Sequence, residues 1–390
     1  MYSSESSGGG EKISRRKFLK LAVGATASLA FTGVVSDSCE KEQEQEKGIN
    51  YSTGMKFHPE HKVDYEAINS ETEKDLESIK EMGCTSVRVY GDNSANLIKA
   101  AEIALQKDLK VWFSPRLING NKEETLNLVV NMAQEAEKLR QKYGDKIVFV
   151  VGNELMLDST AIFEEKGYAD RISRFKKFKA LEMAKGYLNF LKMKTSSPDV
   201  QKFQERVREF TRNLALAAKK EFKGKITYAS LPDENVDWNS FDIVGVNLYE
   251  DISNKDEYEQ KLEDYKQHGK PVAITEYGTA PYKGADRFGG AAHSVIDWEK
   301  GEIGNMLGLL PVVRDEEAQA DYLERLIGLY RKHKIDAHFI FEYVDWNTQH
   351  RPNDPKKDLS TGSFGVVKWT KPGERIESSA SQKIESLFKE

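Results

Sequence analysis

The stretch KIVFVVGNELML, residues 146–157, is an apolar run that ends in a glycine, an asparagine and a glutamate. A continuous apolar run, without polar alternation, is typical of a strand covered on both faces of a parallel sheet. A carboxylate at the end of such a buried strand costs free energy unless something there uses it. Glu154 is therefore a candidate functional residue, and the rest of the sequence indicates what could use it.

Similar runs recur on both sides of this stretch. Further strands are predicted at residues 49–53, 85–90, 109–114, 225–229, 241–246, 271–275 and 336–341. Helical periods separate most of them, at residues 71–82, 95–106, 122–143, 256–268 and 316–333. Strand alternating with helix predicts a parallel sheet, and eight strands predict closure into a (β/α)8 or TIM barrel. A doubly wound open sheet is disfavoured because no glycine-rich phosphate loop follows the first strand.

The predicted barrel domain covers residues 49–390, which is more than the roughly 250 residues typical of this fold. We therefore expect insertions. One is a charged helical segment at 158–222, after the fourth strand, and another is a long glycine-rich loop at 279–315, after the seventh. The short connection between the fifth and sixth strands leaves room only for a vestigial helix.

The first 38 residues are predicted to be an export signal. Arg15 and Arg16 precede a short apolar run that cannot span a bilayer, and the segment resembles a twin-arginine signal peptide. Small residues precede Cys39, so both lipidation of Cys39 and simple cleavage stay open. Residues 39–48 lack an apolar period and are predicted to be a flexible tether. We expect a periplasmic or cell-surface protein, and lipidation would anchor it to a membrane.

Composition excludes several classes of function. The chain has 390 residues, is 39% hydrophobic and carries a net charge of −5, with acidic and basic residues interspersed. No basic stripe indicates nucleic-acid binding. Cys84 is predicted to be a small core residue, and His58 and His61 lack a third ligand at fixed spacing, which favours a solvated loop over a metal site. We expect a monomer with no metal and no cofactor.

Polar and aromatic residues gather where the predicted strands end, which is where barrels of this type carry their chemistry. The candidate site residues are Arg88, Asn153, Glu154, Asn247, Tyr249, Glu276 and Trp346. Glu154 and Glu276 follow the fourth and seventh strands, across the barrel mouth from each other. Hydrolysis of a glycosidic bond needs such a carboxyl pair, about 5–5.5 Å apart for a retaining enzyme. As proton donor, Glu154 would need a pKa raised by apolar surroundings and by the second carboxylate.

Four short motifs lie in order on these strands: RVYGD at 88–92, VGNE at 151–154, VNLY at 246–249 and TEYG at 275–278. Together they resemble the clan A glycoside hydrolases, which are retaining enzymes on (β/α)8 barrels. The motifs are most similar to the β-1,3-glucanase-like branches, and the resemblance extends from residue 49 to about 370. The loops at 279–298 and 350–369 do not match that branch, so the substrate is left open.

The resemblance implies a role for each matching residue. Glu154 matches the general acid/base and Glu276 the nucleophile. Asn153 matches the residue that hydrogen-bonds the sugar hydroxyl next to the reacting carbon. Arg88 matches an arginine beneath the nucleophile, and Tyr249 a tyrosine that hydrogen-bonds the same carboxylate.

Two further residues complete the predicted site. Asn247 would support the pair, and Trp346 would offer an apolar face to a pyranose ring. The chain is thus expected to be an exported retaining glycosidase that acts on a β-linked oligo- or polysaccharide. Two alternatives stay open: a transglycosidase of the same chemistry, and a carbohydrate-binding surface protein that lacks turnover. Taken singly, Glu154 could instead be a helix N-terminal carboxylate and Arg88 an interstrand ion pair.

Overall fold

The computed structural model describes residues 44–57, 61–177, 198–306 and 310–390. The predicted export signal, Cys39 and the first part of the predicted tether lie outside the described residues. Among the helices that are described, none is both long enough and apolar enough to cross a membrane.

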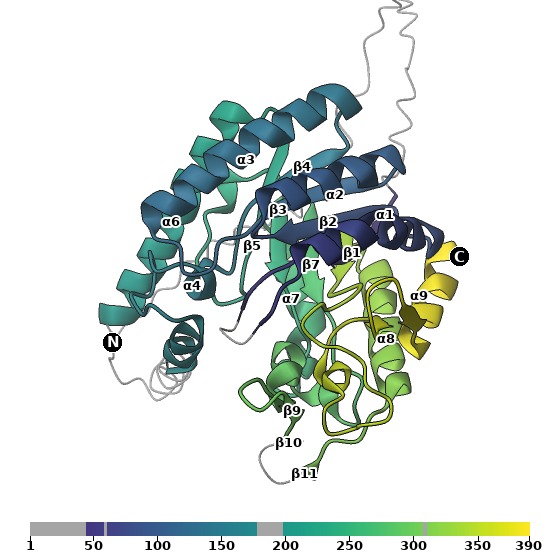
Figure 1. Ribbon diagram of the computed structural model, residues 1–390. Helices are drawn as coiled ribbons and strands as arrows, with labels where there is room; N and C mark the ends of the chain where they lie inside the picture. The colour runs from purple at the N-terminus through teal and green to yellow at the C-terminus, as the bar shows by residue number, and fades with distance from the viewer. Residues whose placement is uncertain (1–43, 58–60, 178–197, 307–309) are drawn as a thin grey trace, which may run out of the picture. The chain divides into compact units, whose positions relative to one another are not determined.

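Eight parallel strands form one sheet, which confirms the predicted (β/α)8 barrel (Figure 1). In spatial order the strands are β5 (Lys225–Ala229), β4 (Ile147–Asn153), β3 (Lys110–Pro115), β2 (Ser86–Gly91), β1 (Glu46–Ser52), β12 (Ala337–Ile340), β7 (Val272–Tyr277) and β6 (Val244–Asn247). A parallel bridge between Ser230 and Val246 joins the two edge strands, and the Asn247 amide donates to the Ser230 carbonyl at 2.8 Å. The sheet therefore closes on itself.

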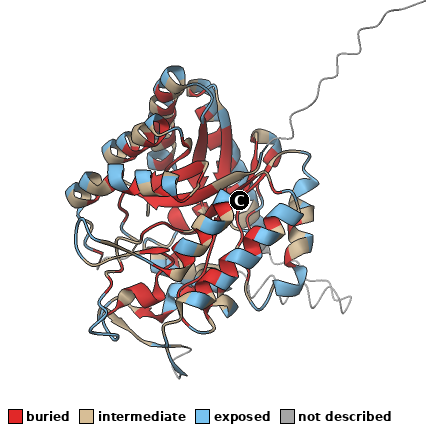
Figure 2. Ribbon diagram, turned by 90° about the vertical axis from the view of Figure 1, so that its right-hand side faces the viewer, coloured by how far each residue is buried: buried red, intermediate tan, exposed pale blue. Residues whose placement is uncertain are grey.

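Helices surround the barrel with their apolar faces turned inward. They are α1 (Tyr65–Glu81), α2 (Ser94–Gln106), α3 (Lys122–Tyr143), α6 (Pro198–Glu221), α7 (Tyr258–Lys266), α8 (Glu316–Lys332) and α9 (Ser379–Lys389). Figure 2 shows buried strands inside and helices that are exposed on their outer sides. The predicted helix at 122–143 coincides with α3, which begins with a capping box between Asn121 and Glu124. Local capping thus fixes where this helix starts.

The interior of the barrel is filled by side chains. Trp112, Val148, Val150, Ala229, Ile243, Ala273, Ala337 and Phe339 form one buried cluster. Gly48 on β1 makes room for it, because a Cβ atom there would overlap the Phe339 ring. The barrel is therefore a packed core, and only its ends are open to chemistry. Cys84 is buried as predicted, and burial raises the pKa of its thiol to about 12.

The segment after β4 corrects one prediction. Residues 158–222 do not form one insertion, since α6 packs between β4 and β5 as the regular helix of that barrel unit. Only the part before α6 is additional, with the short α4 (Leu155–Asp158) and a helical stretch at 168–177. As predicted, the connection between β5 and β6 holds just a single turn, η1 (Trp238–Ser240).

The start of the first barrel strand also differs from the prediction. β1 begins at Glu46, so the tether prediction was wrong for residues 46–48, whose backbone pairs with β12 and β2. The long loop after β7 contains two short 3-10 helices, η3 (Ala285–Arg287) and η4 (Gly289–Val295). It also contains two small strand pairs: β8 (Ile296–Asp297) with β9 (Glu302–Ile303), and β10 (Asn305–Met306) with β11 (Leu310–Pro311). Ahead of α7 lies η2 (Lys255–Glu257), and η5 (Leu359–Gly362), β13 (Val367–Trp369) and β14 (Arg375–Glu377) precede α9.

Candidate active site

Glu154 follows the last residue of β4 in a left-handed backbone conformation, with φ of 38°. Non-glycine residues rarely adopt this conformation, and it is maintained only where the surroundings impose it. Its amide donates to the carbonyl of Ala229 on β5 at 2.9 Å. The next amide, of Leu155, donates to the Tyr228 hydroxyl at 2.7 Å, and the amide of Met156 donates to Glu234 at 3.0 Å. Hydrogen bonds from β5 and the loop after it therefore hold this turn in place.

Glu276 lies near the end of β7 and is 5% exposed. Arg88 Nη1, from β2, donates to Glu276 Oε1 at 2.7 Å, and the Tyr249 hydroxyl donates to Oε2 at 3.1 Å. The arginine is itself fully buried. Both contacts that the sequence analysis expected for this carboxylate are thus present.

A chain of hydrogen bonds connects Glu276 to Glu154. Beyond its contact with Glu276, Arg88 donates from Nη2 to Asn153 Oδ1 at 2.7 Å. Asn247 donates from Nδ2 both to that oxygen, at 3.2 Å, and to Glu154 Oε1, at 2.9 Å. The orientation of Asn247 is set in turn by Thr275, which donates to its Oδ1 at 2.7 Å. The five predicted polar residues Arg88, Asn153, Glu154, Asn247 and Glu276 therefore form one network.

The Asn153 side chain carries a spare donor. Its Oδ1 accepts from Arg88 and from Asn247, and an arginine can only donate, so the amide orientation is fixed. The Nδ2 group is buried and makes no hydrogen bond to any residue that the structure describes. A buried unsatisfied donor of this kind costs free energy unless a ligand or water accepts from it.

The two carboxyl groups differ in their electrostatic surroundings. Burial and, after it, the charge of Glu276 raise the pKa of Glu154 to about 8, against the lowering effect of the Asn247 hydrogen bond. Glu154 has only this amide as a side-chain hydrogen-bond partner among the described residues, while Glu276 has a guanidinium. At neutral pH the pair is therefore suited to one protonated and one ionised carboxyl.

A second buried ion pair lies beside the network, and the sequence analysis missed it. Arg116, at the end of β3, donates to both oxygens of Asp158 at 2.9 Å. Its guanidinium lies between the rings of Phe57 and Tyr90, at 5.1 and 5.8 Å. Arg116 is not among the candidate site residues predicted from the sequence. Asp158 lies four residues after Glu154, and only the folding of α4 over the barrel mouth reveals it as a partner.

Glu234 and Tyr228 were also missed. Glu234 Oε2 accepts from the Tyr228 hydroxyl at 2.8 Å and from the Leu231 amide at 2.9 Å, while its other oxygen holds Met156. Burial raises the pKa of Glu234 to about 7. A tyrosine at a strand end and a carboxylate six residues later are too common a combination to predict that Tyr228 and Glu234 hold the turn after β4.

Trp346 follows β12, and its ring has contacts that the sequence did not predict. Its ring is packed against Arg375, 4.6 Å away, and Trp369, and its indole nitrogen donates to the Ser52 carbonyl at 3.0 Å. One face of the indole is therefore covered by a guanidinium. Phe341, directly after β12, is half-buried and stacks on Tyr90 at 5.9 Å. This phenyl ring is a further aromatic group beside β2, the strand that carries Arg88.

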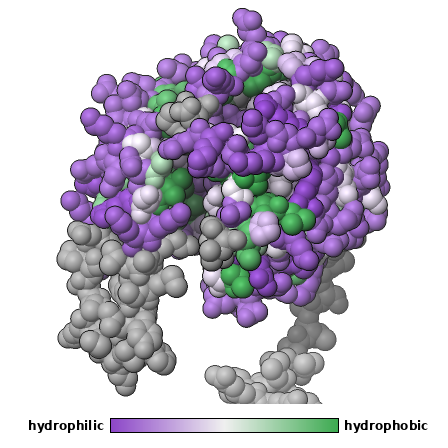
Figure 3. Space-filling view, turned by 60° about the horizontal axis from the view of Figure 1, so that its bottom comes forward, coloured by the Kyte–Doolittle hydropathy of each residue, from purple (hydrophilic) through white to green (hydrophobic). Residues whose placement is uncertain are grey.

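Aromatic side chains from separate loops line the approach to the mouth. Phe57 lies 6.0 Å from the Tyr168 ring, and His61 lies 4.4 Å from Trp298. A cavity of about 620 Å³ adjoins them, lined by residues 56 and 61–66. Figure 3, which brings the end carrying β9 to β11 toward the viewer, shows apolar side chains in the middle of a mostly hydrophilic face. Within the described ranges, no group of three or more His, Cys, Asp or Glu side chains is arranged to hold a metal ion.

The chain matches no known family model, and no curated protein sequence matches it either. Solved structures do share its fold. A GH113 β-1,4-mannanase is 16% identical, with a TM-score of 0.56 over 89% of this chain and 99% of that one. β-Glucuronidase 2 of Bacteroides uniformis is 16% identical, with a TM-score of 0.51 over 84% of this chain and 33% of that one.

A third structure is similar to the same degree. The β-glucuronidase of Parabacteroides merdae is 12% identical, with a TM-score of 0.51 over 89% of this chain and 37% of that one. This chain thus spans about a third of the length of these glucuronidases but nearly the whole mannanase. At such low identity the likeness establishes the barrel fold and leaves the chemistry to the site.

Proposed function

We propose that the protein is a retaining glycoside hydrolase that cleaves a β-linked glycan. The observation that carries this proposal is the hydrogen-bonded network that joins two glutamates. Glu154, directly after β4, has its pKa raised to about 8, and the buried Glu276 of β7 is ion-paired with Arg88. Protonating the leaving oxygen and attacking the anomeric carbon are the two tasks that such a pair divides. The fold shared with a β-1,4-mannanase and β-glucuronidases supports the same reading.

In the first step the Glu276 carboxylate attacks the anomeric carbon while the proton of Glu154 moves to the departing glycosidic oxygen. The product is a glycosyl ester on Glu276 and a free aglycone. In the second step Glu154, now ionised, takes a proton from water, and the resulting hydroxide equivalent displaces Glu276. The free Nδ2 of Asn153 would donate to the hydroxyl next to the reacting carbon, a contact that strengthens as charge develops.

Product stereochemistry tests this mechanism. Proton NMR of a fresh digest should show the β-anomer first, before mutarotation, and a 2-deoxy-2-fluoro glycoside should label Glu276 in a peptide map. Initial release of the α-anomer would contradict the retaining mechanism. If no glycoside or polysaccharide in a broad panel is cleaved while some bind, a carbohydrate-binding protein without turnover would be the better description.

The sugar and the reaction partner are narrower proposals. The motifs favour a β-1,3-glucan, whereas the reported neighbours are a β-1,4-mannanase and β-glucuronidases and lend that branch no support. Transfer to a second sugar uses the same intermediate, and the aromatic approach formed by Phe57, Tyr168, His61 and Trp298 favours a sugar acceptor over water. Product analysis with and without added acceptor separates the two reactions.

Export is part of the proposal. The twin-arginine pattern at Arg15 and Arg16 and the small residues before Cys39 support delivery to the periplasm or cell surface. Fractionation of cells that express the full chain tests it, and mass spectrometry of the mature N-terminus distinguishes acylation of Cys39 from simple cleavage. A monomer is expected, which sedimentation would check.

A further inference from the structure

Glu342 is a buried carboxyl that the proposed mechanism does not use. It follows β12 and is 4% exposed. The Tyr90 hydroxyl donates to its Oε2 at 2.5 Å. Its Oε1 accepts no hydrogen bond from any part of the chain that the structure describes, and this oxygen is not among the fully enclosed side-chain atoms, so a ligand can reach it.

This carboxyl borders the proposed nucleophile. β12 pairs with β7, and the amide of Phe341 donates to the carbonyl of Tyr277, the residue after Glu276, at 2.8 Å. Tyr90, which holds Glu342, lies on β2 two residues after Arg88. The pKa of Glu342 is raised well above its ordinary value by burial and by the charge of Asp345, with a smaller contribution from Glu276.

The guanidinium groups around this position are already committed. Arg88 donates to Asn50, Thr275 and Glu276 from one nitrogen and to Ser114 and Asn153 from the other. Arg116 donates to Asp158 from two nitrogens, and its guanidinium lies near the rings of Phe57 and Tyr90. Each arginine thus has its own carboxylate, and Glu342 and Asp345 have no arginine partner among the described contacts.

Asp345 adds to the acidic character of this side. It accepts from the Asn347 amide at 2.9 Å and from the Ser363 hydroxyl at 3.4 Å, which are neutral donors. A ligand carboxylate placed between Glu342, Asp345 and Glu276 would be desolvated without gaining a free cation. A sugar hydroxyl has no such cost, and it can donate to a carboxyl oxygen whether that carboxyl is ionised or protonated.

We propose that the sugar ring bound against Glu276 carries no carboxylate, that one of its hydroxyls bonds the unoccupied oxygen of Glu342, and that Glu342 makes the site reject uronic acids. This inference rests on the proposed function, because it assigns the sugar that the same site accepts. It separates this chain from enzymes that act on glucuronides, since a glucoside and a glucuronide differ only at the carbon that bears the carboxylate.

Matched activated substrates test the inference with the natural chain. The dinitrophenyl β-glycosides of glucose, mannose, glucuronic acid and glucosamine carry the same leaving group. We expect kcat/KM for the better neutral glycoside to exceed that for the glucuronide by about a hundredfold or more, whereas the glucosaminide, which has no carboxylate, should not be rejected in this way. A preference for the glucuronide overturns the inference. Failure to cleave any of the four, or any oligosaccharide, overturns the proposed function and the inference with it.

A variant identifies the residue responsible. Glu342→Gln keeps the size of the side chain and removes its acidity. We expect the neutral-over-glucuronide ratio of kcat/KM to fall by about tenfold, because the amide cannot become negatively charged and always offers the uronate carboxylate a hydrogen-bond donor. A purely structural role would lower both rates together and leave the ratio unchanged, and that result overturns the assignment.

The matched control is Glu81→Gln, which changes an exposed glutamate at the end of α1 and should leave the ratio as it is. If Glu342→Gln does not fold, Tyr90→Phe provides a second variant. It removes the hydroxyl that orients Glu342 and leaves the carboxyl in place. We then expect KM for the neutral glycoside to rise severalfold, and an unchanged KM counts against the role of Glu342.

Discussion

Carboxylates at the amino-terminal end of the barrel have cationic partners, whereas Glu154 at the carboxyl-terminal end has none. At the amino-terminal end Glu46 forms an ion pair with Lys110 and accepts from Ser86 and from the Trp112 indole, each at 2.9 Å. At the other end Glu154 is half-buried like Glu46, yet its only side-chain hydrogen-bond partner among the described residues is the Asn247 amide. The comparison shows that burial does not distinguish a functional carboxyl in this protein. The hydrogen-bonding capacity of Glu46 is used by its neighbours, whereas Glu154 has few hydrogen-bond partners.

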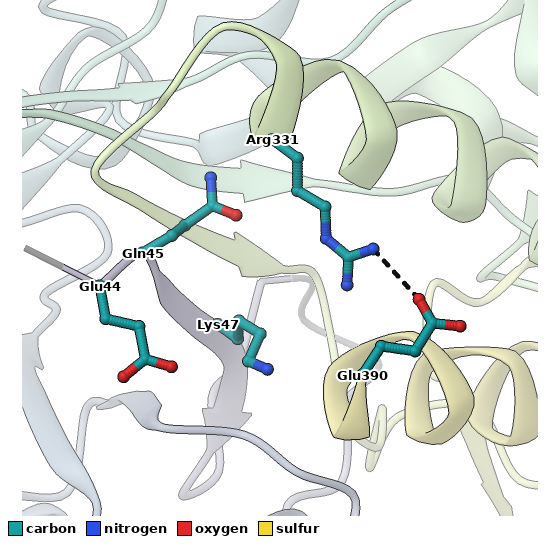
Figure 4. A pocket seen from close by; sticks show the side chains of 5 residues that line it. All are labelled: Glu44, Gln45, Lys47, Arg331 and Glu390. Atoms are coloured by element: carbon teal, nitrogen blue, oxygen red, sulfur yellow. Dashed lines mark hydrogen bonds and ion pairs between the residues drawn. The ribbon is translucent and has the colours of Figure 1, made fainter. Parts of the chain in front are cut away.

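The surface around the amino-terminal end follows the same pattern. Figure 4 shows a cavity of about 260 Å³ lined by Glu44, Gln45, Lys47, Arg331 and Glu390. Lys47 and Arg331 donate to carbonyls in the last turn of α9, and Arg331 also pairs with Glu390 at 3.4 Å. Cations at a helix C-terminus satisfy its free carbonyls and its dipole. The charges that line this cavity therefore have a structural explanation.

Among the variants that compare the two ends of the barrel, we expect the largest loss of activity from replacing Glu276. Glu276→Ala removes the nucleophile, and we expect kcat to fall on the order of 10⁴-fold or more. Glu46→Gln, at the other end, should leave kcat unchanged and lower the free energy of unfolding by about 1–3 kcal/mol, because it weakens a satisfied cluster. Steady-state kinetics and urea unfolding of both variants measure this. Full activity of Glu276→Ala would end the proposed mechanism.

The pH profile depends on Glu154. Since Glu154 must be protonated to act as the acid, and its pKa is raised to about 8, activity should fall as the pH rises beyond about 8. Glu154→Gln should lower kcat for unactivated glycans by roughly 10²–10⁴-fold and remove that limb of the profile. An activated aryl glycoside, which needs less acid assistance, should be affected less in its first step. A limb that persists in the variant would assign it to another group.

Glu234 should affect the rate without touching the substrate. Glu234→Gln has one acceptor oxygen where the natural carboxylate offers two, so one of the three donors from Met156, Leu231 and Tyr228 loses its bond. The turn that carries Glu154 then loosens, and we expect kcat to fall about tenfold with KM little changed. Tyr228→Phe, which frees the Leu155 amide, should act in the same direction. A change confined to KM would show that Glu234 contacts the sugar.

The stability cost of Glu154 should be measurable as a function of pH. Because its folded pKa lies above the unfolded value, the folded chain holds the proton more tightly, and the stability falls as the pH rises from about 4 to about 8. Glu154→Gln should therefore be more stable than the natural chain at pH 8, by about 1–3 kcal/mol, and no more stable below pH 4. Urea unfolding at both pH values tests the sign, and an advantage seen only in acid would contradict it.

The smallest effect is expected at the cavity of Figure 4. Arg331→Ala removes a partly exposed ion pair with Glu390 and a contact with the end of α9. We expect a loss of about 0.5–1 kcal/mol in the free energy of unfolding and unchanged kinetics. A loss of activity as large as that expected for Glu234→Gln would contradict a purely structural role for the amino-terminal end of the barrel.

Sequence patterns predicted what depends on local periodicity and on strand order. The bounds of α3 followed from its apolar period, and the strand ends brought Arg88, Asn153 and Glu276 to one rim. What could not be predicted depends on contacts across the fold. The packing of α6 beside β4 was mistaken for an insertion because the charged sequence before it hides where the regular helix begins.

The same limit applies within the site. Trp346 was expected to stack on a sugar, but the position of Arg375 over its ring depends on how the C-terminal segment folds back. The partners of Arg116 and Glu234 likewise come from loops whose paths no periodicity determines. Residue type at a strand end therefore predicts membership of the rim, while the hydrogen-bond partners require the tertiary structure.

The left-handed backbone of Glu154 has a consequence for laboratory evolution. Glycine adopts that conformation freely and asparagine tolerates it, and neither introduces a carboxyl that must be kept away from water. A library selected only for soluble expression or heat resistance should thus accumulate these residues at position 154 and discard the proton donor. Selection for thermostability would therefore have to include an activity screen, because without one it would yield a stable barrel that is catalytically inactive.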